Sequence, residues 1–224
     1  MTFSIAARCA ETGMFGIAIA SSSPAVASRC AWARAGVGVV ATQNITDPTL
    51  GERGLDLMAL GVDAPQALAV IMETAPFIDY RQLALIDGAG RTACFSGARA
   101  LGVFNTAEGR DCVAAGNMLA SDQVPAAMVA AFEMATGHLA ERLLAAMKAA
   151  MALGGEAGPI HSAGVKVVDT ASWPIVDLRI DWAEDGPIDL LEAAWVVYAP
   201  QIHAYVTRAL DPRDAPSYGV PGDL

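Results

Sequence analysis

The chain has 224 residues and a formal net charge of −10, from 14 Lys and Arg against 24 Asp and Glu, and it is 54% hydrophobic but only 17% charged. Soluble domains are typically about 45–50% apolar and about 25% charged, so this composition excludes intrinsic disorder. The acidic balance argues against a nucleic acid or an anionic membrane surface as partner. A chain of this length buries about 70% of its unfolded surface without needing disulfides or metals. The low charged fraction also favours a homo-oligomer that covers apolar patches.

Three features of the sequence bear on the cellular compartment and on metal binding: the cysteines, the histidines and the N-terminal residues. The four cysteines form no C-x-x-C pair and the three histidines are not paired at ligand spacing. We therefore expect buried thiols and no metal site. No run reaches the roughly 18 apolar residues of a membrane span, and no basic region precedes an apolar one at the start. These features predict a cytoplasmic protein with no membrane partner.

Runs of apolar and β-branched residues predict strands that mostly form antiparallel pairs around short turns. The predicted strands span residues 3–8, 14–20, 36–43, 81–87, 91–95, 111–115, 162–169 and 175–181. Glu11-Thr12-Gly13 and Gly88-Ala89-Gly90 are the turns of the first two predicted hairpins. The pairing of neighbouring strands indicates antiparallel sheets.

Helical spacing of apolar residues predicts helices, mostly in pairs, between the groups of strands. The predicted helices span residues 50–60, 64–74, 121 or 122 to about 136, 138–153 and 187–210. Gly61 ends the first, Asp63 caps the second, Gly154-Gly155 stops the fourth, and Pro200 interrupts the last. We expect residues 1–210 to form a single domain and residues 211–224, rich in proline and glycine, to form an extended tail.

The order of these elements defines the expected fold class. Antiparallel strand pairs with helix pairs between them differ from the strand–helix alternation of a parallel, doubly wound sheet. Two antiparallel sheets stacked face to face, with helices outside, would bury both faces of each sheet. We therefore predict an α+β fold, a four-layer αββα sandwich.

Thr2 is the first candidate for catalytic chemistry. Removal of Met1 leaves a threonine with its hydroxyl and a free α-amine on one residue, and an amine with a pKa of about 7.7–8.0 is a base at neutral pH. Ser21 and Ser22 end the strand predicted to pair with the strand of Thr2, so one of them is expected beside it. Very many proteins begin with Met-Thr, so this feature taken alone favours the alternative, an ordinary strand start.

Three further polar groups are candidates because they follow strands or lie in a Gly-rich connection. The amides of Gly116-Asn117 could donate to an oxyanion, although a plain turn is the alternative. Glu156 and Ser162 lie in or beside the loop between a helix and a strand, where function often resides. A triad of His161, Ser162 and Asp169 is discounted because neighbouring strand residues point to opposite faces. The G-x-G-x-x-A pattern from residue 36 to 41 is rejected because a strand, not a helix, follows it.

Several ordered stretches together resemble a known family. They are Met1-Thr2-Phe3-Ser4-Ile5, Ser21 to Val26, Gly36-Val37-Gly38, Ala41-Thr42-Gln43, Arg81-Gln82, Gly116-Asn117-Met118-Leu119-Ala120, Gly154-Gly155, Ser162-Ala163 and Asp177-Leu178-Arg179-Ile180-Asp181. The set is similar to domain-of-unknown-function family 1028, a largely bacterial family of the N-terminal nucleophile (Ntn) hydrolase superfamily. The resemblance implies an αββα sandwich.

The resemblance also implies roles for the candidate residues. Thr2 would be the nucleophile at the head of the first strand, with Ser21 or Ser22 near it where related hydrolases keep an acidic residue. Asn117 would belong to the turn beside the active centre. Glu156 and Ser162 would lie in the loop that orients the terminal amine.

Three hypotheses about function follow. The first is an amidohydrolase of the Ntn type that acts on a small amide or peptide without metal or cofactor. The second is a non-catalytic ligand-binding or oligomeric scaffold. In proteasome-like proteins a lysine lowers the pKa of the nucleophile, and this chain has no counterpart of it, because Lys148 lies on a predicted helix and Lys166 on a late strand. The third is a hydrolase that uses Asn117, Glu156 or a cysteine.

Overall fold

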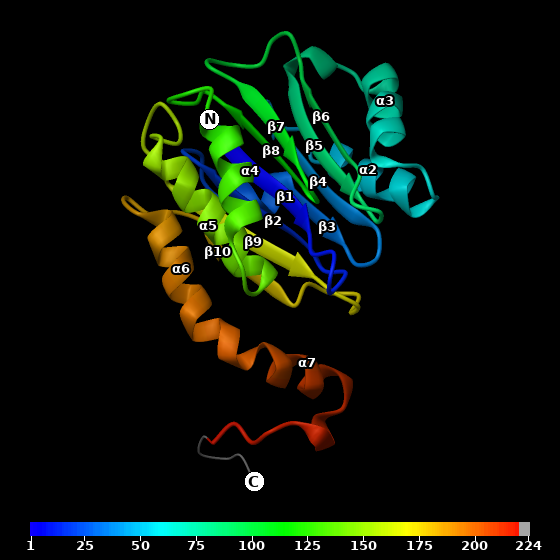
Figure 1. Cartoon of the computed structure of the whole chain (residues 1–224), viewed down its shortest axis with the longest axis vertical. Helices are drawn as coiled ribbons and strands as arrows, with labels where there is room; N and C mark the ends of the chain where they lie inside the picture. Colours follow the sequence, from blue (N-terminus) through cyan, green and yellow to red (C-terminus); the bar gives the residue numbers. More distant parts are fainter. Residues whose placement is uncertain (220–224) are drawn as a thin grey trace.

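Two antiparallel sheets lie face to face at the centre of the molecule (Figure 1), in a computed structural model that describes residues 1–219. The larger sheet has the strand order β10-β9-β2-β1-β8-β7 and the smaller one β3-β4-β5-β6. The larger sheet contains β1 (Thr2–Arg8), β2 (Phe15–Ser21), β7 (Asn105–Gly109), β8 (Cys112–Asn117), β9 (Ser162–Val168) and β10 (Val176–Ile180). The smaller sheet contains β3 (Ala31–Arg34), β4 (Gly38–Asn44), β5 (Arg81–Asp87) and β6 (Thr92–Ser96).

Five helices cover the outer faces of the two sheets and complete the predicted four layers, and one short helix, Val26–Cys30, packs between the sheets. The helices are α1 (Val26–Cys30), α2 (Thr49–Ala59), α3 (Ala64–Thr74), α4 (Val124–Met134), α5 (Leu139–Ala152), α6 (Pro187–Tyr198) and α7 (Ile202–Leu210), with short 3₁₀ turns at η1 (Ile78–Tyr80), η2 (Ala199–Gln201) and η3 (Pro212–Asp214). The α4, α5 and α6 helices pack on the larger sheet, and α2 and α3 pack on the smaller one (Figure 1). The α+β fold class is thus confirmed.

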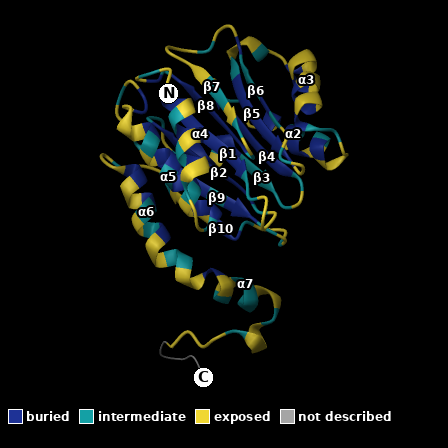
Figure 2. Ribbon diagram, viewed as in Figure 1, coloured by how far each residue is buried: buried dark blue, intermediate teal, exposed yellow. Residues whose placement is uncertain are grey.

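Three apolar layers hold these elements together. Phe3 and Ile5 of β1 face α4 and α5, whereas Ala6 of the same strand faces the smaller sheet. A third layer packs α2 and α3 against the outer face of the smaller sheet. The central strands are therefore dark in the burial view (Figure 2) and are apolar on both faces. This double burial explains the high hydrophobic fraction of the chain.

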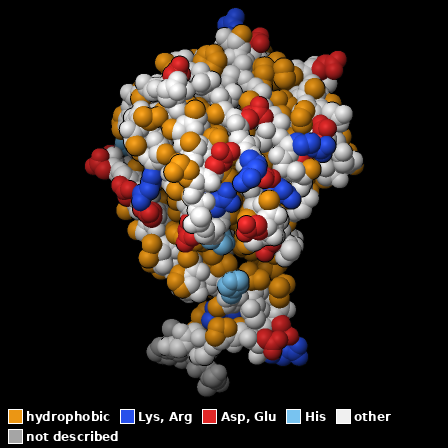
Figure 3. Space-filling view, viewed as in Figure 1, with side chains coloured by type: hydrophobic (Ala, Val, Ile, Leu, Met, Phe, Trp, Pro, Cys, Tyr) orange, Lys and Arg blue, Asp and Glu red, His pale blue; other side chains and the backbone are white. Residues whose placement is uncertain are grey.

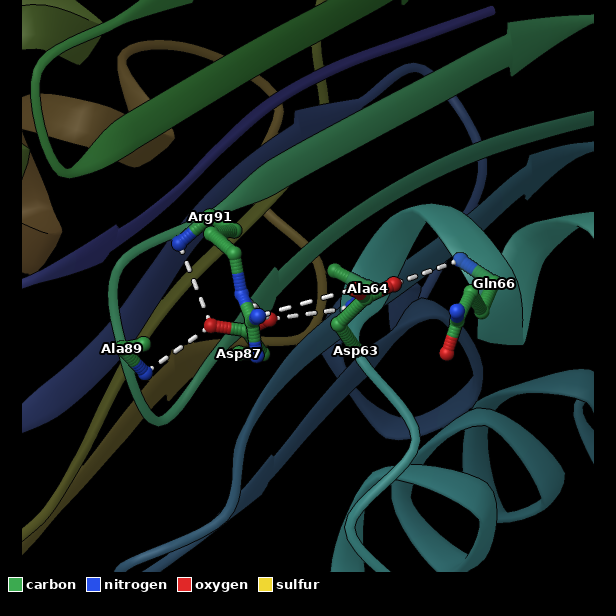
Figure 4. Close-up of polar contacts among 6 residues, drawn as sticks. All are labelled: Asp63, Ala64, Gln66, Asp87, Ala89 and Arg91. Atoms are coloured by element: carbon green, nitrogen blue, oxygen red, sulfur yellow. Dashed lines mark hydrogen bonds and ion pairs between the residues drawn. The ribbon is translucent and has the colours of Figure 1, made fainter.

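Asp63 and Asp87 join the start of α3 to the turn between β5 and β6 (Figure 4). Asp63 caps α3, as predicted, by accepting a hydrogen bond from Gln66 N at 2.9 Å. Asp87 accepts from Ala64 N at 3.0 Å and from Arg91 Nε at 2.8 Å. Burial acts to raise the pKa of Asp87, but its hydrogen bonds hold that pKa below the ordinary value. The carboxylate is therefore a fixed link between the two segments.

Three other predicted helix ends are also confirmed, whereas the helix predicted to open at Ser121 or Asp122 begins at Val124, after Gln123, whose side chain makes no capping hydrogen bond. Gly61 follows the end of α2 with φ +89°, a backbone conformation that glycine adopts without strain. His138 caps α5 by accepting from Ala140 N at 3.2 Å, and Gly154 follows its end with φ +90°. Pro200 lies in the 3₁₀ turn that separates α6 from α7. Local sequence signals determine each of the confirmed boundaries.

Three short elements lie outside the prediction. They are α1, β3 and β7. The β7 strand, Asn105–Gly109, is a polar edge strand with no alternation of apolar residues, and α1 is only five residues long. Elements this short carry little periodicity, so only their packing reveals them.

The C-terminal segment leaves the body of the molecule along α6 and α7 (Figure 1). Of the predicted tail 211–224, residues 211–219 form η3 followed by irregular chain, and residues 220–224 lie outside the described part. Figure 3 shows hydrophobic side chains interspersed with charged ones over the visible face. Val196 and Val197 of α6 are 65% and 68% exposed. Neither the predicted single domain nor the homo-oligomer is tested by these features, and both stay predictions.

Phe132→Ala should lower the free energy of unfolding by about 3–5 kcal/mol, because the ring is fully buried between α4 and the larger sheet. Met134→Ala, on the same helix but 85% exposed, should change it by less than about 0.5 kcal/mol. Denaturant unfolding followed by circular dichroism measures both values. Equal effects of the two substitutions would contradict the packing described here.

Candidate active site

Four polar side chains, one from each of four adjacent strands, form a row at one end of the larger sheet. The β1–β8 register pairs Thr2 with Asn117, and the β2–β9 register pairs Ser21 with Ser162. Thr2 and Ser21 are neighbours across β1 and β2, with their hydroxyl oxygens 3.3 Å apart. Directly paired strand residues point to the same face of a sheet. Four of the five predicted site residues therefore lie side by side.

The row points toward the smaller sheet. Ser4, two residues after Thr2 and hence on the same face, donates to Gln43 Oε1 of β4 at 2.7 Å. Thr2 is only 5% exposed, and Ser21 and Asn117 are fully buried. The row is thus held between the sheets, at the end where β1 begins.

The carbonyl of Met1 lies against two of these hydroxyls. Thr2 Oγ1 is in hydrogen-bond contact with the Met1 carbonyl oxygen, and Ser21 Oγ donates to the same oxygen. The side chain of Met1 lies near Gly158 in the loop between α5 and β9. The predicted proximity of Thr2 and Ser21 is confirmed, and an amide carbonyl occupies the space beside them.

Ser162 holds the turn that follows β2. Its hydroxyl donates to the Ser23 carbonyl oxygen at 2.6 Å and accepts from Val26 N at 3.2 Å. The single hydrogen of the hydroxyl is thereby engaged. Ser162 therefore shapes the backbone beside Ser21 instead of presenting a free hydroxyl to the row.

Glu156 lies behind the same turn and is 3% exposed. Its two carboxylate oxygens accept from Ser22 N at 3.2 and 3.1 Å. Burial raises the pKa of Glu156 from 4.5 to about 7, and the positive Met1 amino group and the Ser22 hydrogen bonds limit that rise. The carboxyl group is therefore near its titration midpoint at neutral pH. It also lies close enough to the Met1 amino group for that positive charge to lower its pKa.

A buried amide network ties the row to the smaller sheet. Gln82 Oε1 accepts from Asn117 Nδ2 at 3.0 Å and from Gln43 Nε2 at 2.8 Å, while Gln82 Nε2 donates to Gly116 O at 2.9 Å. These contacts turn the Asn117 amide nitrogen toward the smaller sheet. Asn117 Oδ1 has no hydrogen-bond partner among residues 1–219. The side chain thus keeps one spare acceptor at the row.

Sequence reasoning did not assign Gln43 and Gln82 to the site. The available signal was the position of each amide at an inward-facing place near the end of a buried strand, where a polar side chain needs a partner. Which partner it finds depends on the stacking of the two sheets. No local pattern carries that information.

His161 lies beside the site but outside the row. Its backbone N donates to Ser21 O at 2.9 Å, and its ring stacks on Trp182 with the ring centroids 4.4 Å apart. Asp169 follows the far end of β9, so His161, Ser162 and Asp169 form no triad. The discounted triad is indeed absent from residues 1–219.

Other features of the described residues are weaker candidate sites than the row. A hollow of about 540 Å³, lined among others by Arg8, Cys9 and Arg142, lies at the end of β1 opposite to Thr2. Within the described residues no group of three or more His, Cys, Asp or Glu side chains could hold a metal ion, and no helix is long and apolar enough to cross a membrane.

The fold and the row of hydroxyls define an αββα protein with a buried, hydroxyl-rich site where the central strand begins. A family model described as "Family of unknown function (DUF1028)" matches residues 2–191, so the chain belongs to this family. Among solved structures, it is similar to protein SPO2555 from Silicibacter pomeroyi, given with the same family model, at 31% identity and a TM-score of 0.84 over 91% of this chain and 94% of that one.

A second solved structure with some similarity is Anbu (ancestral beta-subunit) from Yersinia bercovieri. Here the identity is 12% and the TM-score 0.37, over 91% of this chain and 97% of that one. No curated protein has a significant match to the chain. The predicted family is confirmed by the family model, which matches residues 2–191.

The buried carboxyl of Glu156 should make stability depend on pH. Its pKa is about 7 in the folded protein against an ordinary value of 4.5, so between these pH values the unfolded chain loses this proton while the folded one keeps it. The free energy of unfolding should therefore fall as pH rises from about 4.5 to about 7, and then level off. At about 1.4 kcal/mol per pKa unit, the loss over this interval is at most about 3–4 kcal/mol.

Urea unfolding of wild type and Glu156→Gln across this pH range checks this expectation, because the Gln variant lacks the titrating group. The difference in unfolding free energy between the two proteins should change with pH only in this window. Glu52→Gln, on the exposed face of α2, is the control. A difference that is constant with pH would show that Glu156 titrates normally.

Proposed function

We propose that this protein is an amide-bond hydrolase of the Ntn type that acts on a small amide or peptide after removal of Met1. The observation that carries the proposal is the contact of the Thr2 hydroxyl with an amide carbonyl, that of Met1, to which Ser21 also donates. This contact is with the carbonyl oxygen, so it supports a site that accepts an amide carbonyl beside the two hydroxyls, whose carbon Thr2 would attack. The four-layer fold and the buried position of Thr2 support the same assignment.

The reaction uses Thr2 in two roles. The α-amine freed by loss of Met1 takes the hydroxyl proton while Thr2 Oγ1 bonds to the substrate carbonyl carbon. The carbonyl–nitrogen bond of the substrate then breaks, and the leaving nitrogen takes the proton. Water hydrolyses the resulting ester and restores Thr2. Every atom comes from the substrate, Thr2 or water, so the scheme requires no cofactor or metal.

The surrounding residues support this chemistry. Glu156 feels the charge of the N-terminal amino group and can orient the freed amine of Thr2. Ser162 fixes the turn after β2, and Asn117 presents a spare oxygen next to Thr2 on the neighbouring strand. We further propose that the protein works as a cytoplasmic homo-oligomer, in which exposed apolar side chains such as those of α6 are covered.

A non-catalytic scaffold is the second candidate. One observation favours it: no lysine is available to Thr2. Lys148 pairs with Glu192 on the outer helices, and Lys166 donates to Ala31 O at 3.3 Å and pairs with Asp177 at 3.6 Å. The following experiment separates the two candidates.

A β-lactone, which acylates nucleophilic hydroxyls, should add its mass to protein that begins at Thr2, released from an N-terminal fusion. Thr2→Ala should lower the rate of acylation at least about 1000-fold because it removes the nucleophile, whereas Thr2→Ser should retain part of it. Protein that keeps Met1 should not react, because its Thr2 nitrogen is an amide. Intact mass and peptide mapping measure the modification.

Thr12→Ala, in the hairpin turn at the other end of β1, is the matched control and should react like the wild type. A panel of amino-acid amides and dipeptides then identifies turnover. Equal acylation of Thr2→Ala and the wild type would reject Thr2 as nucleophile and favour the scaffold.

A further inference from the structure

A chain of hydrogen bonds runs from α1 to the carbonyl beside Thr2. Arg29 Nη2 donates to Ser23 Oγ at 3.2 Å, and Ser23 Oγ lies 2.8 Å from Ser21 Oγ. Ser21 Oγ donates in turn to the Met1 carbonyl oxygen. A guanidinium group is thus linked through two hydroxyls to the carbonyl at the site.

The chemistry of the groups determines the direction of these hydrogen bonds. A guanidinium only donates, so Ser23 Oγ accepts from Arg29 and its own hydrogen is left for Ser21. Ser21 Oγ also accepts from Ser23 N at 3.1 Å. With two donors on its oxygen, the Ser21 hydroxyl directs its hydrogen at the carbonyl oxygen. A hydroxyl that accepts hydrogen bonds is polarised and becomes a stronger donor.

The charge of Arg29 is not neutralised by a carboxylate. Among residues 1–219, Arg29 belongs to none of the ion pairs within 4.0 Å. Its other hydrogen bonds go to the carbonyl oxygens of Pro24, at 2.6 Å, and Ala25, at 3.2 Å. Its positive charge therefore acts on neutral oxygens of the turn, where a charge-assisted hydrogen bond is stronger than a neutral one.

The backbone around Arg29 is anchored to the larger sheet. Ser162 bonds to both Ser23 O and Val26 N, and Ala25 N donates to Asp181 O at 2.8 Å. Ala25 itself has φ 52°, in the left-handed region that a non-glycine residue enters only when its surroundings hold it there. The short α1 helix is thus held in one position relative to Ser21.

Backbone amides near Asn117 are less available to an oxyanion. Met118 N donates to Leu101 O at 2.9 Å, and Leu119 N donates to Val103 O at 2.8 Å. The Ser21 hydroxyl, by contrast, already donates to an amide carbonyl that lies against Thr2. That carbonyl stands in for the one that Thr2 would attack in a substrate.

We infer that Ser21 is the oxyanion donor of the site and that Arg29, through Ser23, strengthens this donor and supplies the positive charge for which no lysine is available. The inference rests on the proposed function. Ser21 is then a catalytic residue that touches the reacting carbonyl, and Ser23 and Arg29 are positioning residues. As Thr2 Oγ1 adds to the carbonyl carbon, the electron pair moves to the carbonyl oxygen, where the Ser21 hydrogen bond and the nearby positive charge stabilise it.

The test uses protein that begins at Thr2 and a β-lactone, with the maximal acylation rate and the half-saturating concentration measured separately. Ser21→Ala should lower the maximal rate by about 100-fold to 1000-fold with little change in half-saturation, as expected for a lost oxyanion donor. Arg29→Gln should lower the rate about 10-fold, and Arg29→Lys should recover part of this loss because it keeps the charge. Arg34→Gln, whose arginine pairs with the exposed Asp56, is the matched control.

A double-mutant cycle separates this role from a structural one. In a Ser23→Ala background, Arg29→Gln should lower the rate by much less than in the wild-type background, because the hydrogen-bonded link is already broken and only the through-space effect of the charge is left. An equal loss in Arg29→Gln and Arg29→Lys, or a full effect of Arg29→Gln without Ser23, would overturn the inference. Equal acylation of the wild type and the Ser21 and Arg29 variants would overturn this inference alone, whereas no acylation of the wild type would overturn the proposed function with it.

Discussion

The position of β1 between β2 and β8 is the constraint on which the rest of the structure depends. Because the strand is paired on both edges and covered on both faces, neither its register nor its direction can shift without exposing Phe3 and Ile5 or burying them against the wrong layer. A fixed register places the first residue of the strand between Ser21 and Asn117. The geometry of the site is therefore a consequence of core packing.

Polar groups between the sheets make that packing specific. Ser4, Gln43, Gln82 and Asn117 are fully buried, and a buried amide without partners is costly. Gln82 accepts two hydrogen bonds and donates two, so it satisfies its neighbours only when the sheets stack in one relative position. The network thus couples the alignment of the smaller sheet to the orientation of Asn117 beside Thr2.

The charges of the site are arranged around a neutral row of hydroxyls. Glu156 lies on one side of the turn after β2, held by Ser22 N, and Arg29 lies on the other, held by the carbonyl oxygens of the turn. Neither side chain pairs with the other, so each can act on the groups near Thr2. The turn from Ser21 to Val26 therefore joins the hydroxyl row to both charges. By fixing this turn, Ser162 helps to position both charges relative to Thr2.

Short-range signals in the sequence determined the β1–β2 hairpin, the helix cap at Asp63 and, through the hairpin, the closeness of Thr2 and Ser21. Each depends on residues within about one hairpin or one helical turn of each other, where spacing alone sets the geometry. Only the tertiary structure decided that β8 lies beside β1, that Gln82 holds Asn117, that Ser162 is occupied by the turn, and that Arg29 of the unpredicted α1 points at Ser23. Apart from the Arg29–Ser23 contact, which spans six residues, these contacts join segments separated by up to 139 residues, from Ser23 to Ser162, and they exist because sheet order and face-to-face burial bring the segments together.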